Sequence, residues 1–535
     1  MLCKMEFKRS LLFVIFVAIQ QFQPIDSARI LGFFSTPSRS HLIIHESLMR
    51  ELASRGHDVT VITTFKQIGK PIPNYRYIEV TVPEDPEFKK AQEHMLKGAE
   101  KGEHFLKHFS TLVKATTGQT SKILKSTAMD EIKKEKFDLV VFGQFINDFQ
   151  IGLAHHFNCP SVIITVFPAV KSVRDFVGNP DEFSSVPHLF IGANDRMTFT
   201  QRFLNVLISG MEMALSSGME YFLMEPLYRE HFPLETFPSY WDMRKNVSLI
   251  LVNQHFSQGT PQALVPALQE FSGMHIKRKP DPLPENIQQW LDSATDGVIY
   301  FSMGSNTKSS DLSLDKRQAI LRTFATLKQK VLWKFEDDLP DKPKNVMISK
   351  WLPQDDVLAH ANVVLFISHC GKGGLSEAKY HGVPVLGIPI LADQPSNLKI
   401  AVKEGWAVGL QYADLNEKTF SDALHEALSN RTYGDVVRRH SLKFRDRPQH
   451  PLDNAAFWVE YVIRHHGAKH LQSPGAHLNF FQFYSLDVFA ALLLIFYITV
   501  KVSKCFLKFL YRKICGGSSS DSKTKPNSKN DKKRQ

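Results

Sequence analysis

Cysteine is scarce in this sequence, with five residues in a chain of 535. This number excludes a disulfide scaffold, and no group of cysteines and histidines has the spacing of a zinc site. Hydrophobic residues make up 43% of the chain, and glycine and proline occur at ordinary frequency, which excludes collagen-like and wholly disordered classes. The length predicts about two to four domains with large cores.

Most of the chain also lacks excess charge. The formal net charge is +11, but residues 501–535 carry nearly all of it. Residues 28–500 are close to neutral, so the composition does not favour a nucleic-acid-binding surface. The positive charge belongs to a C-terminal tail.

The N-terminus has the pattern of a secretory signal. Basic residues precede the apolar run 11–19, and small residues follow it at 27–28. The run is too short to span a bilayer, so we expect residues 1–27 to be a cleaved signal peptide. A buried N-terminal helix is the alternative.

A second apolar stretch, residues 480–500, is expected to span a membrane once, with aromatic side chains at its start forming an interfacial belt. Basic residues follow it, so the positive-inside rule predicts a cytosolic tail, 501–535, and a lumenal body. An amphipathic surface helix is the alternative. The ending Lys532-Lys533-Arg534-Gln535 resembles the dilysine retrieval signal of endoplasmic-reticulum membrane proteins, or is a solvated run of charge. Glycosylation sequons at Asn246 and Asn430 fit a lumenal body.

Strand and helix patterns alternate in two regions. The first has apolar strands at 29–34, 58–63, 137–142 and 161–166, a helix after the first strand, and another at 148–157. Helices rich in Phe and Met are expected within 85–135 and 185–240. Proline density peaks at 277–284, and the alternation then restarts. Its strands are expected at 298–302, 330–335, 346–350, 363–368 and 384–389, and its helices at 314–328, 373–380, 395–403 and 417–428.

This alternation predicts an α/β protein with two doubly wound, Rossmann-like domains, residues 28–284 and 285–445. A helical segment, 446–479, follows. Two such domains joined by a proline-rich hinge predict a cleft between them. Ligands of open α/β sheets bind beyond the carboxyl ends of the strands.

The clearest candidate for chemistry follows the strand at 363–368. In His369-Cys370-Gly371-Lys372-Gly373-Gly374-Leu375-Ser376-Glu377, glycines at a strand end precede a helix, which can bring main-chain amides and a helix dipole to a phosphate. His369 can donate to a phosphate oxygen, and Glu377 can accept from ribose hydroxyls. Neither GxGxxG nor GxxxxGK[ST] occurs, so the common dinucleotide and P-loop fingerprints are missing. A tight turn without a ligand is the alternative.

Residues on both sides of this turn could complete a nucleotide-sugar site. Trp351 can stack on a base and Gln354 can bond to a base or ribose, although a lone Trp is more often a core residue. Asp393 and Gln394 precede Pro395 at the expected start of a helix, where they could bond sugar hydroxyls. Alternatively, Asp393 only caps that helix.

Together these residues resemble a known family. Residues 351–394 look like the signature block of the UDP-glycosyltransferases, and the resemblance extends through Phe301-Ser302-Met303-Gly304-Ser305 and over nearly the whole chain. The membrane span and the Lys-Lys-x-x ending resemble the endoplasmic-reticulum branch in animals. Residues 161–168 and 255–266 look closest to the insect members.

The resemblance implies a glycosyltransferase-B fold that binds the UDP-sugar in its C-terminal half and the acceptor in its N-terminal half, with residues 446–479 returning to the first domain. It implies no metal or other cofactor, because the UDP-sugar is a co-substrate, and it favours glucose as the sugar. It assigns Trp351 and Gln354 to uracil and ribose, Ser305, His369, Gly371, Gly373 and Gly374 to the diphosphate, Glu377 to ribose, and Asp393 and Gln394 to the transferred sugar.

His41 is the expected general base. It follows the first strand, at the position of the family's catalytic histidine. It also opens a helix, whose N-terminal dipole disfavours the imidazolium, so a neutral ring can accept a proton from an acceptor hydroxyl. His45, one turn later, is the competitor and is expected to be structural.

One departure from the family concerns the carboxylate that orients this histidine. The family often has it near the end of the strand at 137–142, where this sequence has Gly143-Gln144. The nearest acid, Asp148, either reaches His41 or caps its own helix. If it does not reach, His41 lacks the anion that fixes its tautomer.

The leading hypothesis is inverting transfer of a hexose, with glucose expected, from a UDP-sugar to a hydroxyl of a small lipophilic acceptor, with a role in detoxification. The Phe- and Met-rich helices expected within 85–135 and 185–240 favour a malleable apolar pocket for acceptors such as phenols, flavonoids, steroids or odorants. The rival is a catalytically impaired, membrane-anchored protein that binds lipophilic ligands or UDP-sugar. A soluble nucleotide-dependent oxidoreductase is disfavoured by the missing fingerprints and the membrane tail. No nucleic-acid partner is expected, and a homo-oligomer stays open.

Overall fold

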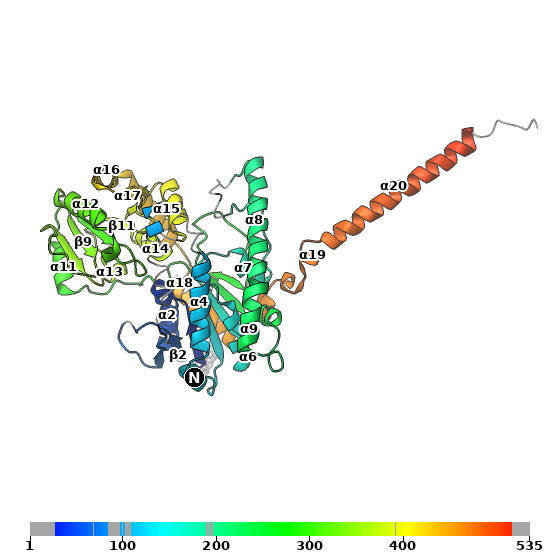
Figure 1. The fold of residues 1–535 in the computed structure, drawn as a ribbon, viewed down its shortest axis with the longest axis horizontal. Coiled ribbons are helices and arrows are strands. Elements are labelled where there is room, and N and C mark those ends of the chain that lie inside the picture. The colour runs from blue at the N-terminus through cyan, green and yellow to red at the C-terminus, as the bar shows by residue number, and fades with distance from the viewer. Residues whose placement is uncertain are drawn as a thin grey trace, which may run out of the picture. The chain divides into compact units, whose positions relative to one another are not determined.

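The computed structural model describes residues 27–67, 69–83, 97–98, 100–101, 109–188, 191, 196–390 and 392–515. The signal peptide expected at 1–27, except Ser27, and the Lys-Lys-x-x ending lie outside the described residues. The chain divides into a body that ends at Ala476 and a C-terminal segment that begins at His477. The two parts are described separately (Figure 1).

The N-terminal half of the body is built on a parallel sheet of seven strands in the order β3-β2-β1-β4-β5-β6-β7. The strands expected at 29–34, 58–63 and 161–166 are present, and the strand expected at 137–142 begins and ends two residues later, so that it includes Gly143 and Gln144. Three short strands were not expected: β3, β6 and β7. The strands are β1 (Arg29–Phe34), β2 (Asp58–Thr63), β3 (Tyr75–Glu79), β4 (Leu139–Gln144), β5 (Ser161–Thr165), β6 (Leu249–Val252) and β7 (Leu268–Glu270).

Helices cover both faces of this sheet because its strands are apolar on both sides. Ile30 and Leu31 of β1 point into different cores, as the period of two along a strand requires. One core includes α2 (Arg39–Ser54) and α18 (Pro451–Arg464), so the chain returns from the second domain to pack on the first. On the other face lie α4 (Phe109–Leu124), α5 (Thr127–Ile132), η2 (Asp148–Ile151), α6 (Gly152–His156), α7 (Lys171–Arg174), η3 (Asp175–Val177), α9 (Glu225–His231) and α10 (Tyr240–Lys245).

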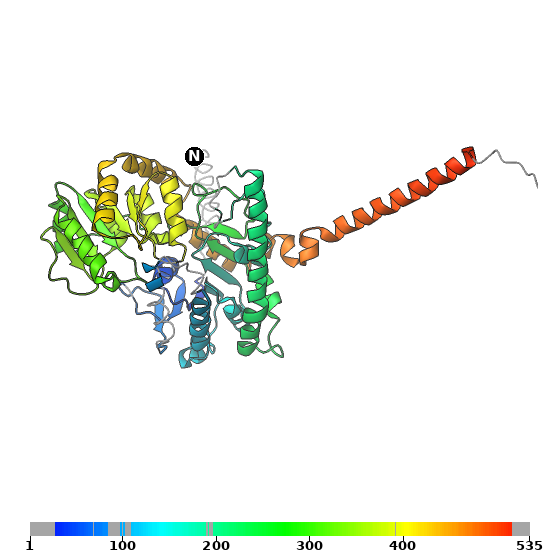
Figure 2. The ribbon, with the colours of Figure 1, turned by 45° about the horizontal axis from the view of Figure 1, so that its top comes forward.

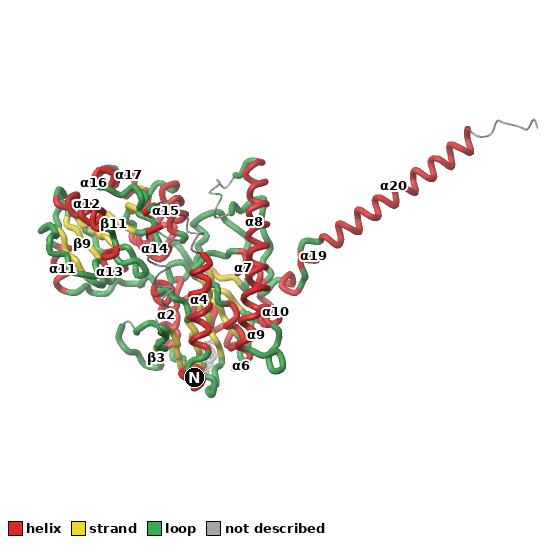
Figure 3. The backbone as a smooth tube through the Cα atoms, viewed as in Figure 1, coloured by secondary structure: helices red, strands yellow, loops and turns green. Residues whose placement is uncertain are grey.

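The helix expected at 148–157 therefore divides into a 3₁₀ turn, η2, and the short helix α6. In the region expected to be helical at 185–240, the described residues form α8 (Phe199–Met219), the π-helical turn η4 (Glu220–Met224) and α9 in succession. Figure 3 shows this long helical insertion beside the strands of the sheet.

The C-terminal half of the body has a six-stranded parallel sheet in the order β10-β9-β8-β11-β12-β13. Here too the strands feed two cores, with Ile299 in one and Tyr300 in the other. Its strands are β8 (Val298–Ser302), β9 (Lys330–Lys334), β10 (Val346–Ser349), β11 (Val363–Ser368), β12 (Val385–Gly387) and β13 (Ala407–Gly409). Its helices include α11 (Glu285–Asp292), α12 (Leu314–Ala325), α13 (Gln354–Leu358), α14 (Lys372–His381), α15 (Gln394–Lys403), α16 (Glu417–Ser429) and α17 (Thr432–Arg445).

The fold class predicted from the sequence is thus confirmed: two doubly wound parallel α/β sheets and a C-terminal apolar helix. The proline-rich segment 277–284 lies between β7 of the first sheet and α11 of the second domain. Figure 2 shows the two sheets as separate lobes of the body.

The C-terminal segment contains α19 (Phe480–Phe483) and α20 (Leu486–Cys515). Within the described residues, α20 alone is long and apolar enough to cross a membrane. It begins later than the expected span of 480–500 and continues past it, because the basic residues after Val500 prolong the same helix.

Candidate active site

The residues predicted to bind the UDP-sugar lie close together because three strands of the second sheet end side by side. Ser302, Ser368 and Gly387 are the last residues of β8, β11 and β12, and they pair in register. The loops after these strands carry Ser305, His369 and Asp393. The carboxyl edge of a parallel sheet is where such proteins bind ligands.

Glycines allow the His369 ring to lie between two turns of main chain. A Cβ atom on Gly304 would lie 2.4 Å from the ring's Cε1 atom, and one on Gly371 would lie 2.6 Å from its Nε2 atom. Burial lowers the pKa of His369 to about 4, so the ring is neutral at physiological pH. Its Nδ1 atom is buried without a hydrogen-bond partner, as is Ser305 Oγ. Buried polar atoms without partners are uncommon, and two in one loop cluster indicate a site for a polar ligand.

The loops after β11 and β12 each contain a non-glycine residue with a positive backbone φ angle. Cys370 has a φ of 66° and Ala392, in the loop after β12, has a φ of 53°. Non-glycine residues seldom adopt such angles outside sites where the surrounding structure imposes them. Asn397 connects the two loops, because its Nδ2 atom donates to the Cys370 carbonyl at 3.1 Å and to Asp393 Oδ2 at 2.6 Å.

Asp393 stands at the N-cap position of α15, but its side chain makes no capping hydrogen bond. Its bond from Asn397 instead directs the carboxylate to the loop after β11. Burial raises the pKa of Asp393. Gln394 is buried, and its Oε1 atom accepts from the Ile390 amide at 2.8 Å. Simple helix capping therefore does not account for Asp393.

A second group of residues lies at the start of α13 and α14. Gln354 Nε2 donates to Glu377 Oε2, and Tyr300 donates to Gln354 Oε1 at 3.2 Å. Burial, reinforced by the charge of Asp355, raises the pKa of Glu377 to about 8. Trp351 is 45% exposed, so it is not a core residue. Arg39 lies over its ring at 5.7 Å and comes from the first domain.

His275 belongs to this group, although no sequence pattern pointed to it. It follows β7 of the first domain, and its Nε2 atom lies 3.7 Å from Glu377 Oε1. The ring is buried, neither of its nitrogens has a hydrogen-bond partner, and burial lowers its pKa. A Cβ atom on Gly373 would lie 3.7 Å from its Nε2 atom. The first domain thus contributes a histidine directly beneath the glycine turn.

The two candidate histidines of the first domain have different environments. His41 is the third residue of α2 and is partly exposed, with Phe145 edge-on at 4.9 Å. Burial lowers its pKa to about 4, and its Nδ1 atom has no hydrogen-bond partner. His45 is fully buried and stacks on Phe34 at 4.8 Å. His41 is therefore the one that a ligand could reach.

Asp148 does not hydrogen-bond to His41 in the structure, and it does not cap its helix. Its Oδ2 atom lies 3.4 Å from Arg244 Nη1, and Glu220 lies 3.0 Å from the same guanidinium. The buried arginine requires these carboxylates, so the proposed orienting role of Asp148 is replaced by an ion pair. His45 fills the space beside Gly143, where a Cβ atom would lie 2.6 Å from the ring's Cε1 atom.

One hydrogen bond brings the two halves of the site together. Asn306 Nδ2, in the loop that holds Ser305, donates to Ser38 Oγ at 2.9 Å. Ser38 precedes the helix that carries His41. The loop expected to hold the diphosphate and the loop that holds the candidate base therefore touch.

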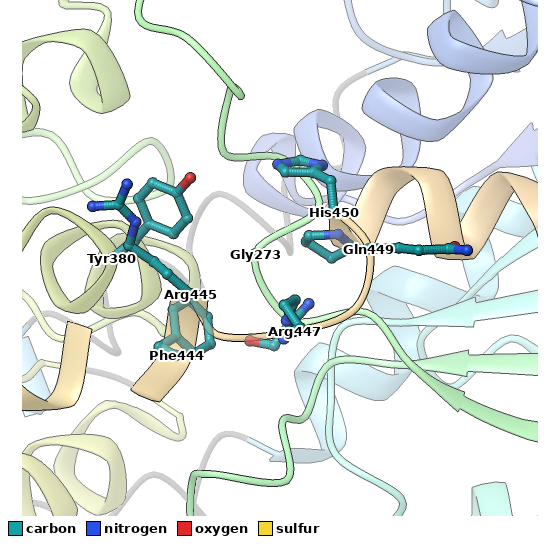
Figure 4. A pocket seen from close by; sticks show the side chains of 9 residues that line it. Gly273, Tyr380, Phe444, Arg445, Arg447, Gln449 and His450 are labelled. Carbon is teal, nitrogen blue, oxygen red and sulfur yellow. The ribbon is translucent and has the colours of Figure 1, made fainter. Parts of the chain in front are cut away.

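A cavity of about 170 Å³ lies elsewhere, where residues 446–450 cross between the domains (Figure 4). Tyr380, Phe444, Arg447 and His450 line it, and it contains none of the predicted site residues. No group of three or more potential metal ligands occurs in the described part of the chain. Of the sequons, Asn246 is exposed, whereas Asn430 is half-buried and its Nδ2 atom donates to Glu426 at 3.0 Å.

Comparisons with known proteins show the family to which the chain belongs. The family described as "UDP-glucoronosyl and UDP-glucosyl transferase" matches residues 33–520. UDP-glucosyltransferase 2 of Dactylopius coccus is 34% identical, over 92% of this chain and 93% of its own. UDP-glucuronosyltransferase 2B7 of Homo sapiens is 31% identical, over 88% and 92%. Among solved structures, the spinosyn forosaminyltransferase SpnP has a TM-score of 0.54 at 15% identity, over 82% of this chain and 100% of its own, which shows a shared fold.

Proposed function

The chain belongs to the UDP-glucuronosyl and UDP-glucosyl transferase family and is a UDP-glycosyltransferase, and we propose that it transfers glucose from UDP-glucose to a hydroxyl of a small lipophilic acceptor. The hydrogen bond between Asn306 and Ser38 carries the proposal, because it joins the loop with the unpartnered Ser305 hydroxyl to the helix with His41. The insect relative named as a glucosyltransferase supports glucose as the sugar.

The proposed reaction is a single displacement that inverts the anomeric carbon. His41 accepts the proton of the acceptor hydroxyl, whose oxygen attacks the anomeric carbon while the bond from that carbon to the UDP oxygen breaks. The neutral state of the His41 ring supports this role, since a base must begin unprotonated. The proton remains on the imidazole until the product leaves, and the electron pair of the broken bond leaves with UDP.

The leaving UDP needs stabilisation, and the donor half supplies it. The amides at the start of α14, the Ser305 hydroxyl and the His369 ring can all donate to the diphosphate. Trp351 stacks on uracil, Gln354 and Glu377 bind the ribose, and Asp393 and Gln394 bind the hydroxyls of the sugar. We propose that these donors replace a metal ion, so turnover is expected to be unchanged by a chelator.

A second candidate function rests on the partner of Asp148. Because Arg244 binds this carboxylate, Asp148 is not available to stabilise the protonated form of His41. The chain could then bind UDP-sugar and lipophilic ligands with little or no transfer.

Product analysis distinguishes the two. Microsomes that contain the full chain are supplied with UDP-glucose, UDP-glucuronate or UDP-N-acetylglucosamine and a panel of phenols, flavonoids and steroids, and glycosides are detected by mass spectrometry. A glucoside that His41→Ala abolishes supports the transferase. UDP protection against heat or protease without any glycoside supports the binding protein.

We also propose a type I topology in the endoplasmic reticulum. The expected signal peptide directs the body into the lumen, α20 spans the membrane, and the basic tail with its dilysine ending stays cytosolic. The exposed position of Asn246 supports lumenal glycosylation there in preference to Asn430. Glycosidase treatment of the wild type and of Asn246→Gln, together with protease protection of intact microsomes, tests this topology.

A further inference from the structure

The cavity of about 170 Å³ between the domains carries only positive formal charge on its walls. The described residues that line it include two arginines, Arg445 and Arg447, and no aspartate or glutamate. They come from the loop after β7, from α14, from the end of α17 and from the segment that crosses between the domains. In Figure 4, Arg445 lies with Tyr380 on one side of the gap, and Arg447 and His450 lie on the other. A cavity lined in this way attracts an anion.

The guanidinium of Arg447 is half-buried and has no acidic partner in the described part of the chain. Its Nε atom donates to His255 Nε2 at 3.1 Å, which requires that histidine to be neutral. Burial lowers the pKa of Arg447 to about 10, and no carboxylate offsets this shift. Buried Arg244, in contrast, has Asp148 and Glu220 at 3.4 and 3.0 Å. Arginines removed from water are normally paired, so the charge of Arg447 is the exception.

His450 adds a hydrogen-bond donor to the same cavity. Its Nδ1 atom accepts from the Leu452 amide at 3.3 Å, at the start of α18, so the proton of the neutral ring belongs on Nε2. The Nε2 atom is buried and has no hydrogen-bond partner among the described residues. A buried N–H group without an acceptor costs free energy, which a ligand with an acceptor oxygen would recover.

Two carboxylates near His450, those of Glu51 and Asp453, are already paired elsewhere. Arg55 holds them at 3.0 and 2.7 Å, and Arg278 holds them at 3.4 and 2.5 Å. Neither carboxylate therefore neutralises the arginines of the cavity. These arginines are left to an anion from solution.

We propose that this cavity binds a phosphate group, held by the guanidinium of Arg447 together with Arg445 and His450. The planar guanidinium can donate two parallel hydrogen bonds to two phosphate oxygens, and the His450 Nε2–H group can donate to a third. The size agrees, because a cavity of about 150 Å³ admits benzene, with six heavy atoms, whereas phosphate has five. A whole nucleotide does not fit, so a larger ligand would leave its remainder outside.

A phosphate bound here joins parts of the body that are remote in sequence. Tyr380 lies on α14, the helix that also carries Glu377, and the loop that contains Gly273 continues to His275. Bound phosphate therefore holds the crossing segment against elements of both domains and raises the unfolding temperature of the body. The site contains none of the residues proposed to bind the UDP-sugar or the acceptor, so the inference does not depend on those assignments.

The test titrates inorganic phosphate calorimetrically into the full chain in detergent, with saturating UDP-glucose present to occupy the donor half. We expect the wild type to bind one phosphate per chain. Arg447→Gln is expected to weaken this binding about 10–100-fold, because hydrogen bonds to a charged group have that magnitude. His450→Asn removes the Nε2 donor but can still cap α18, and it should weaken binding about 3–10-fold.

A second titration with glycerol 3-phosphate distinguishes two sources of the phosphate group. Tighter binding than that of inorganic phosphate would identify the ligand as a phosphate monoester whose remainder lies outside the cavity. Weaker binding would identify it as the free ion. Either result supports the site, provided that Arg447→Gln weakens the binding of both.

Arg322→Gln is the matched control, since it removes an exposed arginine of the second domain that pairs with Glu417 at 2.6 Å. It is expected to bind phosphate like the wild type. Phenylglyoxal, which modifies arginine side chains, locates the ion in the wild type: phosphate should slow the modification of Arg445 and Arg447 and leave that of Arg322 unchanged. Peptide mass spectrometry measures this protection, and circular dichroism checks that the variants fold.

Three results would overturn the proposal. The wild type might bind no phosphate beyond the donor half. Equal losses in Arg447→Gln and Arg322→Gln would attribute the binding to overall charge, and unchanged binding in Arg447→Gln would place the ion at another site. If Arg447→Gln does not fold, the titration of His450→Asn and the protection of Arg447 in the wild type decide the question, and no effect in either contradicts the site.

Discussion

The two halves of the active site hold their histidines in opposite ways. His369 and His41 both follow a buried strand, and burial lowers the pKa of both rings to about 4. His369 is fixed between two glycines, inside a cluster of polar groups. His41 lies beside Phe145 and Phe167, with no polar partner for its Nδ1 atom. The donor half is built for one ligand with a fixed arrangement of hydrogen-bonding groups, whereas the acceptor half offers one polar atom in apolar surroundings.

The largest expected effect comes from removing His41, the proposed base. His41→Ala should lower kcat by about 10²–10⁴-fold, because general-base assistance has that magnitude. The Kd of UDP should stay unchanged, since His41 lies outside the donor half. Steady-state kinetics and calorimetric titration with UDP measure the two quantities. If UDP affinity fell in parallel with kcat, the two halves would not be separable as described.

Next in size is the effect of Asp148 on stability. Asp148→Asn removes one of the two carboxylates around buried Arg244 and should cost about 3 kcal/mol of unfolding free energy. The kcat of the folded fraction should change little, because Asp148 does not bond to His41. Thermal unfolding and kcat per folded molecule are compared. A loss of kcat as large as that of His41→Ala would mean that Asp148 reaches the histidine during the reaction.

The glycine turn offers a matched pair of substitutions. Gly371→Ala would place a Cβ atom 2.6 Å from His369 Nε2 and displace the ring, which should weaken UDP binding about 10–100-fold through lost hydrogen bonds to the diphosphate. Gly373→Ala meets only His275 Nε2, at an ordinary 3.7 Å, and keeps its amide. It should bind UDP nearly as the wild type does. Equal losses in both variants would contradict a role for the His369 ring.

The smallest expected effect is the pH dependence of donor binding. The pKa of Glu377 is raised to about 8, so this carboxyl is mostly protonated at pH 7 and ionised at pH 9. If Glu377 binds the ribose as proposed, its ionised form can accept from both ribose hydroxyls, so the KM for UDP-sugar should fall by up to about 10-fold as the pH rises from 7 to 9. Glu377→Gln should remove this slope and raise KM. A slope that persists in the variant would point to another titrating group.

The raised pKa of Glu377 also makes the stability of the folded protein depend on pH. Because the folded-state pKa of Glu377 lies above its ordinary value, the folded protein binds this proton more tightly than the unfolded chain. The contribution of Glu377 to stability is therefore greatest below its ordinary pKa and declines as the pH rises toward about 8. UDP binding should partly restore the stability lost at pH 8–9, because the ribose hydroxyls satisfy the buried carboxylate.

The sequence by itself determined the α/β alternation, the glycine turn after β11 and the family. These depend on local patterns: runs of apolar residues, glycines at a strand end, and a proline at the start of α15. It also indicated His41, because a residue at the carboxyl end of a strand faces the ligand edge of its sheet.

Only the tertiary structure decided which side chains meet. Asp148 could have oriented His41, but Arg244, remote in sequence, binds its carboxylate, and His45 fills the space beside Gly143. No pattern predicted His275 beneath Gly373, or the exposure of the apolar side chains of α8, which their composition alone would have buried. The physical reason is that propensity acts between neighbours in the chain, whereas desolvation and charge pairing act between groups that folding brings together.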